Sequence, residues 1–259
     1  MELKNKTILI TGGTSGLGYQ FASKLHALGN TVIITGRDQA KLDATSARLP
    51  GIHAFQNDVS DPGAILALYN KVSSRFAGLD ILINNAGEMR TIKLRDNIVA
   101  MPDITREIDI NLTGPIRMIQ QFLPLLKQSR SAAILNVTSG LALIPFPLSP
   151  IYGASKSGLR SYTKSLRAQL KGSNIRVMEL VAPAAKTPLN DKFENIDGFD
   201  SKMLMAPEKL VDAAIKGLKE DKPEIYPGLA RIFLVMSRLA PAFMLKQTSK
   251  VGASLMLGK

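Results

Sequence analysis

The fold is decided by the segment Thr7-Ile8-Leu9-Ile10-Thr11-Gly12-Gly13-Thr14-Ser15-Gly16-Leu17-Gly18, in which a short apolar run leads into four closely spaced glycines. The apolar run predicts a buried β-strand, and the amphipathic stretch 17–28 predicts a helix. Glycines at such a turn let the backbone bend sharply and let another group approach it closely. The free N–H groups at the start of the helix favour an anion there. A glycine turn without a ligand is the alternative.

The same alternation of strand and helix continues along the chain. We expect strands at 7–11, 31–35, 52–56, 81–84, 132–138 and 175–181, and helices at 17–28, 39–49, 63–76, 115–127 and 152–170. Strands that are apolar on both faces are typical of a parallel sheet covered by helices on both sides. The sequence therefore predicts one doubly wound, Rossmann-like α/β domain over 1–259, with ligands at the carboxyl ends of its strands.

The composition excludes several kinds of site. Cysteine is absent, so the chain has no disulfide and no thiolate nucleophile, and His26 and His53 are its only histidines. A metal centre or a Ser-His-Asp triad is therefore not expected. The first residues do not resemble a signal peptide, and no apolar run reaches the ~18 residues of a membrane span. We therefore expect a cytoplasmic protein.

The formal net charge of +12 suggests an anionic partner, although a basic proteome explains it equally well. Nucleic acid, an anionic membrane surface and a phosphorylated cofactor are the three candidates. Tryptophan is absent and aromatic residues make up 5% of the chain. A platform of interleaved aromatic and basic residues is therefore missing, and we expect no nucleic-acid partner.

The end of the second predicted strand bears on the choice of cofactor. In dinucleotide-binding folds, an acidic residue there binds a ribose 2′-hydroxyl, and an arginine nearby binds a 2′-phosphate. This strand is followed by Gly36 and Arg37 and has no acidic residue at its end. The sequence therefore predicts NADP(H), unless Arg37 is a solvated charge that opens the next helix.

Three residues predict an acid–base site. Tyr152 and Lys156 lie four residues apart, on one face of a predicted helix. A lysine cation favours the phenolate, so we expect it to lower the pKa of the tyrosine. Ser139 follows an apolar strand, where its hydroxyl can donate to a carbonyl oxygen that gains negative charge.

Two asparagines are weaker candidates. Asn84 ends the fourth predicted strand within Asn84-Asn85-Ala86-Gly87, where an Asx turn is the alternative reading. Asn111 falls within a helical pattern although asparagine is a poor helix former. It binds a water, kinks the helix, or is a tolerated surface residue.

Taken together, these motifs resemble the short-chain dehydrogenase/reductase family, from about Lys4 to about Thr187. The resemblance implies an oxidoreductase with the catalytic tetrad Asn111, Ser139, Tyr152 and Lys156. Ser139 would orient the substrate carbonyl, Tyr152 would exchange the proton, Lys156 would bind the nicotinamide ribose, and Asn111 would hold a water relay. It also implies a set of cofactor-binding residues: Gly12, Thr14, Ser15, Gly16, Leu17, Gly18, Arg37, Asp58, Val59, Asn84, Ala86, Gly87, Tyr152, Lys156 and Thr187.

The chain departs from the family at Pro183. The family usually has Pro-Gly there, with a threonine four residues after the glycine; here Ala182 and Pro183 precede Thr187. Proline has no N–H, so the backbone contacts at this point are in doubt. The run 179–187 resembles a subgroup that includes the oxidoreductase of lipoteichoic-acid D-alanylation operons.

The remaining sequence carries further expectations. Residues 188–206 resemble the family's substrate lid, and its apolar residues suggest an apolar pocket or ordinary core packing. The basic tail 227–259 has Ile232, Val235, Met236 and Leu239 at helical spacing. This stripe packs on the core or a second subunit, or makes weak contact with an anionic membrane. We expect a homodimer or homotetramer acting on a small carbonyl or alcohol. The alternatives are a non-catalytic NADP-binding protein and a peripheral membrane-associated factor.

Overall fold

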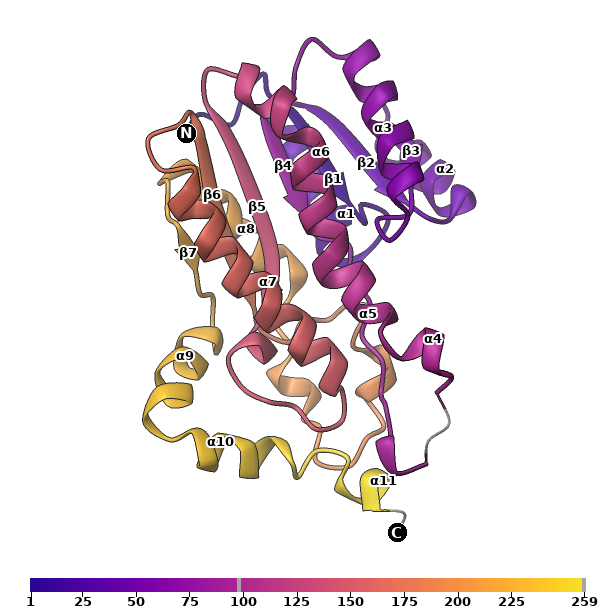
Figure 1. The fold of residues 1–259 in the computed structure, drawn as a ribbon, viewed down its shortest axis with the longest axis vertical. Coiled ribbons are helices and arrows are strands. Elements are labelled where there is room, and N and C mark those ends of the chain that lie inside the picture. Colours follow the sequence, from indigo (N-terminus) through magenta and orange to yellow (C-terminus); the bar gives the residue numbers. More distant parts are fainter. Residues whose placement is uncertain (97–98, 258–259) are drawn as a thin grey trace.

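The computed structural model describes residues 1–96 and 99–257. Their strands form one parallel sheet of seven strands in the order β3-β2-β1-β4-β5-β6-β7 (Figure 1). The strands are β1 (Thr7–Thr11), β2 (Thr31–Gly36), β3 (His53–Gln56), β4 (Ile81–Asn84), β5 (Ala132–Ser139), β6 (Ile175–Ala182) and β7 (Glu224–Ile225). Sequential strands run outward from β1 in one direction and from β4 in the other. The predicted fold class is therefore confirmed.

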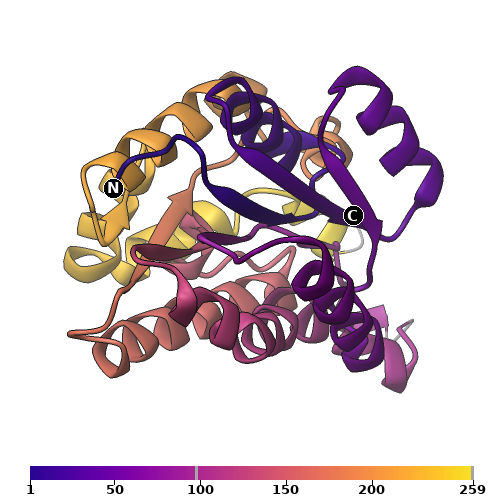
Figure 2. The same cartoon turned by 90° about the horizontal axis from the view of Figure 1, so that it is seen from above.

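Helices cover both faces of the sheet (Figure 2). The longer ones are α1 (Gly16–Ala27), α2 (Gln39–Arg48), α3 (Pro62–Arg75), α6 (Gly114–Gln128), α7 (Pro150–Gln169) and α8 (Pro207–Lys219). Alternate residues of each strand point to opposite faces. Ile8 therefore packs with α1, α2 and α8, whereas Leu9 packs with α3, α6 and α7. Both faces of the strands are buried, which explains their continuous apolar runs.

Two helices begin where the sequence places a capping residue. Asp38 accepts a hydrogen bond from the backbone N–H of Lys41 at 3.1 Å, and Asp61 accepts one from Gly63 at 2.7 Å. Each carboxylate satisfies an N–H group that the first turn of a helix leaves without an intrahelical partner. The six strands and five helices that the sequence predicts begin and end within two residues of the predicted bounds.

Short helices connect β4 to α6. They are η1 (Leu94–Asp96), α4 (Met101–Ile104), α5 (Arg106–Ile108) and the π-helix η2 (Asp109–Thr113). A π-helix of one turn accommodates an extra residue in a helix and is frequent at functional sites. Here it contains Asn111, for which the sequence offered a kink as one alternative.

The last third of the chain carries the predicted lid and tail. Within 188–206 lie the short helices η4 (Asp191–Phe193) and η5 (Ser201–Met203), and the tail forms α9 (Ala230–Leu239), α10 (Pro241–Thr248) and α11 (Ala253–Leu257). Phe233 of α9 packs on the loop after β5, because its ring carbon lies 2.9 Å from where a Cβ on Gly140 would be. No helix in the described part of the chain is long and apolar enough to cross a bilayer.

Candidate active site

A cavity of about 480 Å³ lies at the carboxyl ends of the strands. Its wall comes from the glycine turn, from the ends of β2, β5 and β6, and from the lid and tail. Most of the predicted site residues line it: Gly12, Thr14, Ser15, Gly16, Leu17, Arg37, Asp58, Val59, Ala86, Gly87, Ser139, Tyr152, Lys156 and Thr187. Gly18, Asn84 and Asn111 do not. The doubly wound topology thus gathers residues that are far apart in sequence.

The glycine turn is shaped by two positive φ angles and two close approaches. Gly12 and Gly16 have φ values of +67° and +51°, in the left-handed region that favours glycine. A Cβ on Gly18 would lie only 2.0 Å from the carbonyl oxygen of Gly12. Gly18 therefore allows α1 to pack against the turn and does not form the cavity wall. Gly16 lies against Thr187, whose methyl carbon would be 3.2 Å from a Cβ at that position.

Asn85, rather than Asn84, joins the glycine turn to the end of β4. Its side-chain amide donates to the carbonyl oxygens of Thr11 and Gly12, at 3.0 and 3.1 Å. Asn85 lines the cavity, whereas Asn84 donates to the buried side chain of Asn136 at 2.9 Å. The Asn84 side chain therefore does not line the cavity, because alternate residues at a strand end point to opposite faces.

Ser139, Tyr152 and Lys156 meet in the cavity, and all three are buried. The Ser139 hydroxyl accepts a hydrogen bond from the backbone N–H of Leu141 at 3.1 Å and lies near enough to the Tyr152 phenol to lower its pKa. Lys156 donates to the carbonyl oxygen of Val137 at 2.9 Å, and its Nζ lies 5.8 Å from the centroid of the tyrosine ring. The end of β5 thus supplies Ser139 and the carbonyl that binds the Lys156 amine, while the first turns of α7 supply both Tyr152 and Lys156.

Burial shifts the two titratable groups in opposite directions. It raises the pKa of Tyr152 to about 12; the bond to Ser139 lowers it and the charge of Glu107 raises it further. Burial lowers the pKa of Lys156 to about 8. The cost of burying a phenolate therefore outweighs the lowering of the Tyr152 pKa that the sequence predicts from Lys156.

Asn111 ties the loop after β4 to α7. Its side chain accepts from the backbone N–H of Glu88 and donates to the carbonyl oxygen of the same residue, both at 2.8 Å. It also donates to the hydroxyl of Ser155 at 3.0 Å, and Ser155 donates to the carbonyl oxygen of Tyr152 at 2.7 Å. Asn111 is fully buried, so the surface alternative is wrong. Its role in a water relay stays a prediction.

The residues present fit a nicotinamide dinucleotide. The glycine turn leaves the backbone open to a diphosphate at the start of α1. Both side-chain polar atoms of Asn57 are buried, line the cavity and have no hydrogen-bond partner among the described residues, and the same holds for the hydroxyl of Thr35. Such groups need a partner, which a bound ligand supplies. Lys41 adds a second cation to Arg37 in the cavity wall.

The model of the short chain dehydrogenase family matches residues 6–197, which is most of the chain. The chain belongs to this family. It is similar to the uncharacterized oxidoreductase DltE of Bacillus subtilis (strain 168), with 37% identity over 87% of this chain and 89% of that protein. The resemblance drawn from the sequence is therefore confirmed, and the match to DltE supports the subgroup.

Solved structures agree with this membership. The 3-ketoacyl-(acyl-carrier-protein) reductase of Brucella melitensis, complexed with NADH, is 30% identical to this short chain dehydrogenase. The two structures superpose with a TM-score of 0.75, and the match covers 83% of this chain and 91% of the reductase. A short chain dehydrogenase of Burkholderia cenocepacia J2315 in complex with NADP has a TM-score of 0.81 at 23% identity. The match covers 96% of this chain and 99% of that one. The second likeness is one of fold alone.

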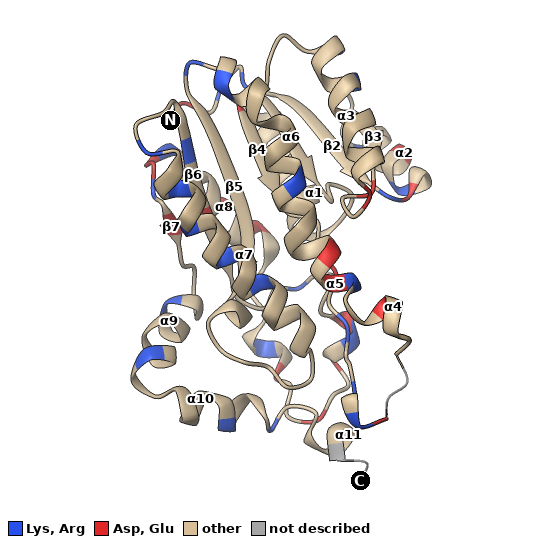
Figure 3. Ribbon diagram, in the orientation of Figure 1, with Lys and Arg blue, Asp and Glu red and all other residues tan. Residues whose placement is uncertain are grey.

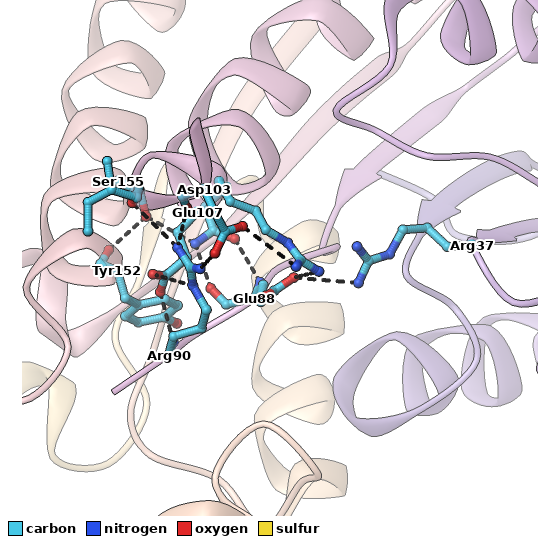
Figure 4. A network of polar contacts seen from close by, with 10 residues as sticks. Arg37, Glu88, Arg90, Asp103, Glu107, Tyr152 and Ser155 are labelled. Atoms are coloured by element: carbon cyan, nitrogen blue, oxygen red, sulfur yellow. Dashed lines mark hydrogen bonds and ion pairs between the residues drawn. The ribbon is translucent and has the colours of Figure 1, made fainter. Parts of the chain in front are cut away.

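A network of charges lies beside the site of this short chain dehydrogenase (Figure 4). The carboxylate of Glu88 lies 3.5 Å from Arg37 and 3.1 Å from Arg106. Arg90 pairs with the fully buried Glu107 at 3.2 Å. These three ion pairs were not predicted from the sequence, nor were Asn57, Asn85 and Lys41. Charged residues between strands resemble a solvated surface, so the sequence carries no signal for the pairs.

The buried lysine predicts a pH-dependent stability difference. The folded-state pKa of Lys156 lies below its usual 10.5, so the cost of burying the cation is present below pH 8 and is relieved as the pH rises toward 10.5. Relative to Lys156→Met, the unmutated protein should therefore gain about 2–3 kcal/mol of unfolding free energy between pH 8 and pH 10. Urea unfolding of both proteins across that range measures the difference.

A matched control isolates the buried site. Lys171 is exposed, so Lys171→Met should follow the unmutated protein at every pH. The rise in the Tyr152 pKa does not interfere, because it acts above pH 10 and in both proteins alike. A constant stability difference between Lys156→Met and the unmutated protein would contradict the burial of a charged lysine.

Proposed function

We propose that this chain transfers hydride between NADP(H) and a carbonyl or alcohol substrate, with Tyr152 as the acid and base. The observation that carries the proposal is the meeting of Ser139, Tyr152 and Lys156 in the cavity that the glycine turn also lines. A proton donor and a dinucleotide cradle in one cavity are what carbonyl reduction requires.

The residues divide the chemistry between them. When bound at the glycine turn, a reduced nicotinamide cofactor would supply the hydride. The Ser139 hydroxyl would donate to the substrate carbonyl oxygen, and Tyr152 would give its phenolic proton to the same oxygen as negative charge develops. Lys156 is held toward the cavity by Val137 and can bind ribose hydroxyls. Because burial raises the pKa of Tyr152 to about 12, the phenol is protonated at neutral pH, which favours reduction.

The substrate end of the cavity is apolar. The side chains that line it there come from the loop after β5, from the lid and from α9: Leu141, Ile144, Phe146, Phe193, Phe199, Met203, Leu204 and Phe233. Tyr152 itself belongs to the small apolar cluster around Phe193. Such a wall favours an apolar aldehyde or ketone over a sugar or a charged acid. The same apolar wall also accounts for the apolar residues of 188–206.

The choice of NADP(H) rests on Arg37 and Lys41. Both cations line the cavity, and β2 ends without a carboxylate that would take a ribose hydroxyl. A 2′-phosphate would accept charge-assisted hydrogen bonds from them. The relatives with bound cofactors include one with NADH and one with NADP, so they support a nicotinamide cofactor without favouring either form.

A cofactor-oxidation screen tests the proposed function. The purified protein is mixed with NADPH or NADH and a panel of apolar aldehydes, ketones and quinones, with a sugar and an α-keto acid for comparison. We expect turnover with NADPH and apolar carbonyls, and slower turnover with NADH. Tight NADPH binding without turnover of any carbonyl would instead indicate the non-catalytic cofactor-binding alternative.

A further inference from the structure

The tail exposes a face that the proposed chemistry does not use. We define the tail face as Ile232, Val235, Leu239 and Phe243, which lie on the adjacent helices α9 and α10 and are 49% to 77% exposed. With Leu245 and Leu255, the tail holds six of the eleven large apolar side chains that are exposed among the described residues. Such a concentration on one segment marks an interaction surface, because single exposed apolar residues are normally scattered.

Cations surround this face. Arg231 and Arg238 lie on α9, Lys246 lies on α10 and Lys250 follows it; all four are exposed. Residues 226–259 contain no Asp or Glu. Figure 3 shows basic residues and no acidic ones on α9 and α10. The charge of the face is therefore complementary to an anionic surface.

The inner side of the same segment reaches the cavity. Phe233, Thr248 and Val251 line it, whereas the residues of the tail face do not. The segment therefore has two sides with different tasks, one that closes the apolar cavity and one exposed to solvent. Ile232, Val235 and Leu239 are exposed and do not pack on the core, whereas Ala230 and Phe233 of the same helix pack inward.

We propose that the tail face docks this protein on an anionic lipid membrane. Helices with apolar residues on one side and cations beside them lie in the plane of a membrane interface, where the apolar residues enter the acyl boundary and the cations contact anionic headgroups. A second copy of the chain fits less well. A twofold contact would place the four cations of one tail against those of the other with no acidic residue of the tail to neutralise them.

Vesicle co-sedimentation tests the docking. The full chain is mixed at low salt with equimolar phosphatidylglycerol/phosphatidylcholine vesicles, or with phosphatidylcholine vesicles alone. We expect binding to the anionic vesicles only, and release by added salt, because screening weakens surface charge interactions. Each cation contributes about five-fold in affinity. Arg231→Gln with Arg238→Gln should therefore weaken binding on the order of twenty-fold.

Matched variants separate the tail face from general effects. Leu239→Ser with Phe243→Ser should abolish binding, whereas Leu66→Ser, which alters an exposed leucine of α3, should leave it unchanged. Lys71→Gln with Arg130→Gln removes the same charge elsewhere and should also preserve binding. Unfolding temperatures show that each variant is folded.

Three outcomes would overturn the proposal. They are no binding by the intact protein, equal binding to both kinds of vesicle, and equal losses in the tail and control variants. Sedimentation velocity adds a fourth. If Leu239→Ser with Phe243→Ser converts a dimer to monomers, the face joins two copies of the chain and does not dock on lipid.

Discussion

Replacing Tyr152 by phenylalanine should lower kcat by about 10²–10⁴ while leaving the affinity for NADPH near normal. The ring stays in the apolar cluster with Met89, Leu148 and Phe193, so the packing is retained. Only the hydroxyl is lost, and with it the proton donor. Ser139 keeps its bond from Leu141, so the loop after β5 has a remaining anchor. Single-turnover reduction and fluorescence titration of NADPH measure the two quantities separately.

Tyr162 supplies the matched control. It lies on the same helix, α7, but packs in the cluster on the far side of the sheet from α1 and does not line the cavity. Tyr162→Phe removes a phenol from the same helix and should keep the unmutated kcat. The proposed acid–base role would fail if Tyr152→Phe retained full turnover on a verified substrate, or if both variants lost rate equally.

Replacing Arg37 by alanine should remove most of a preference for NADPH over NADH of about ten- to a hundred-fold. A hydrogen bond to a charged group contributes about 1.5–3 kcal/mol, and each ~1.4 kcal/mol is a factor of ten. Arg37 also pairs with Glu88, but losing that pair changes little, because partly exposed ion pairs are worth about 0–1 kcal/mol. Glu88 also keeps Arg106 as a partner, so the loop loses little. NADPH affinity should fall and NADH affinity should hold.

Arg48 separates the local contact from the overall charge. It lies at the end of α2, is exposed and does not line the cavity. Arg48→Ala changes the net charge by the same amount and should leave both affinities unchanged. Titrating NADPH and NADH into all three proteins shows the pattern. Equal weakening of both cofactors by Arg37→Ala would mean that Arg37 does not bind the 2′-phosphate.

The sequence was most informative about the sheet. Apolar runs and glycine turns located the first six strands and the five helices between them, because local composition controls where such elements begin and end. Helix α8 and strand β7 were not predicted. Helix α8 follows the lid without a glycine turn to mark it, and β7 has only two residues. The expected cytoplasmic location and homo-oligomeric state stay predictions.

The site was predictable where its residues follow strand ends, and less so where they act through contacts between distant segments. Ser139, Tyr152 and Lys156 were named from spacing, and the structure brings them together. The pKa of Tyr152 was not predictable, because it depends on burial and on Glu107. The choice between Asn84 and Asn85 depends on which face of β4 each residue takes at the end of the strand.

The contact between Phe233 and Gly140 links two parts of the chain that would otherwise vary independently. The phenylalanine ring occupies the volume that any side chain at position 140 would need. A larger residue at 140 is therefore compatible with this backbone only if the Phe233 ring moves or position 233 becomes smaller. The family model ends at residue 197, so the size of a tail residue outside it limits which residue can follow Ser139 inside it. Transplanting a tail from one relative to another therefore requires that both positions be exchanged together.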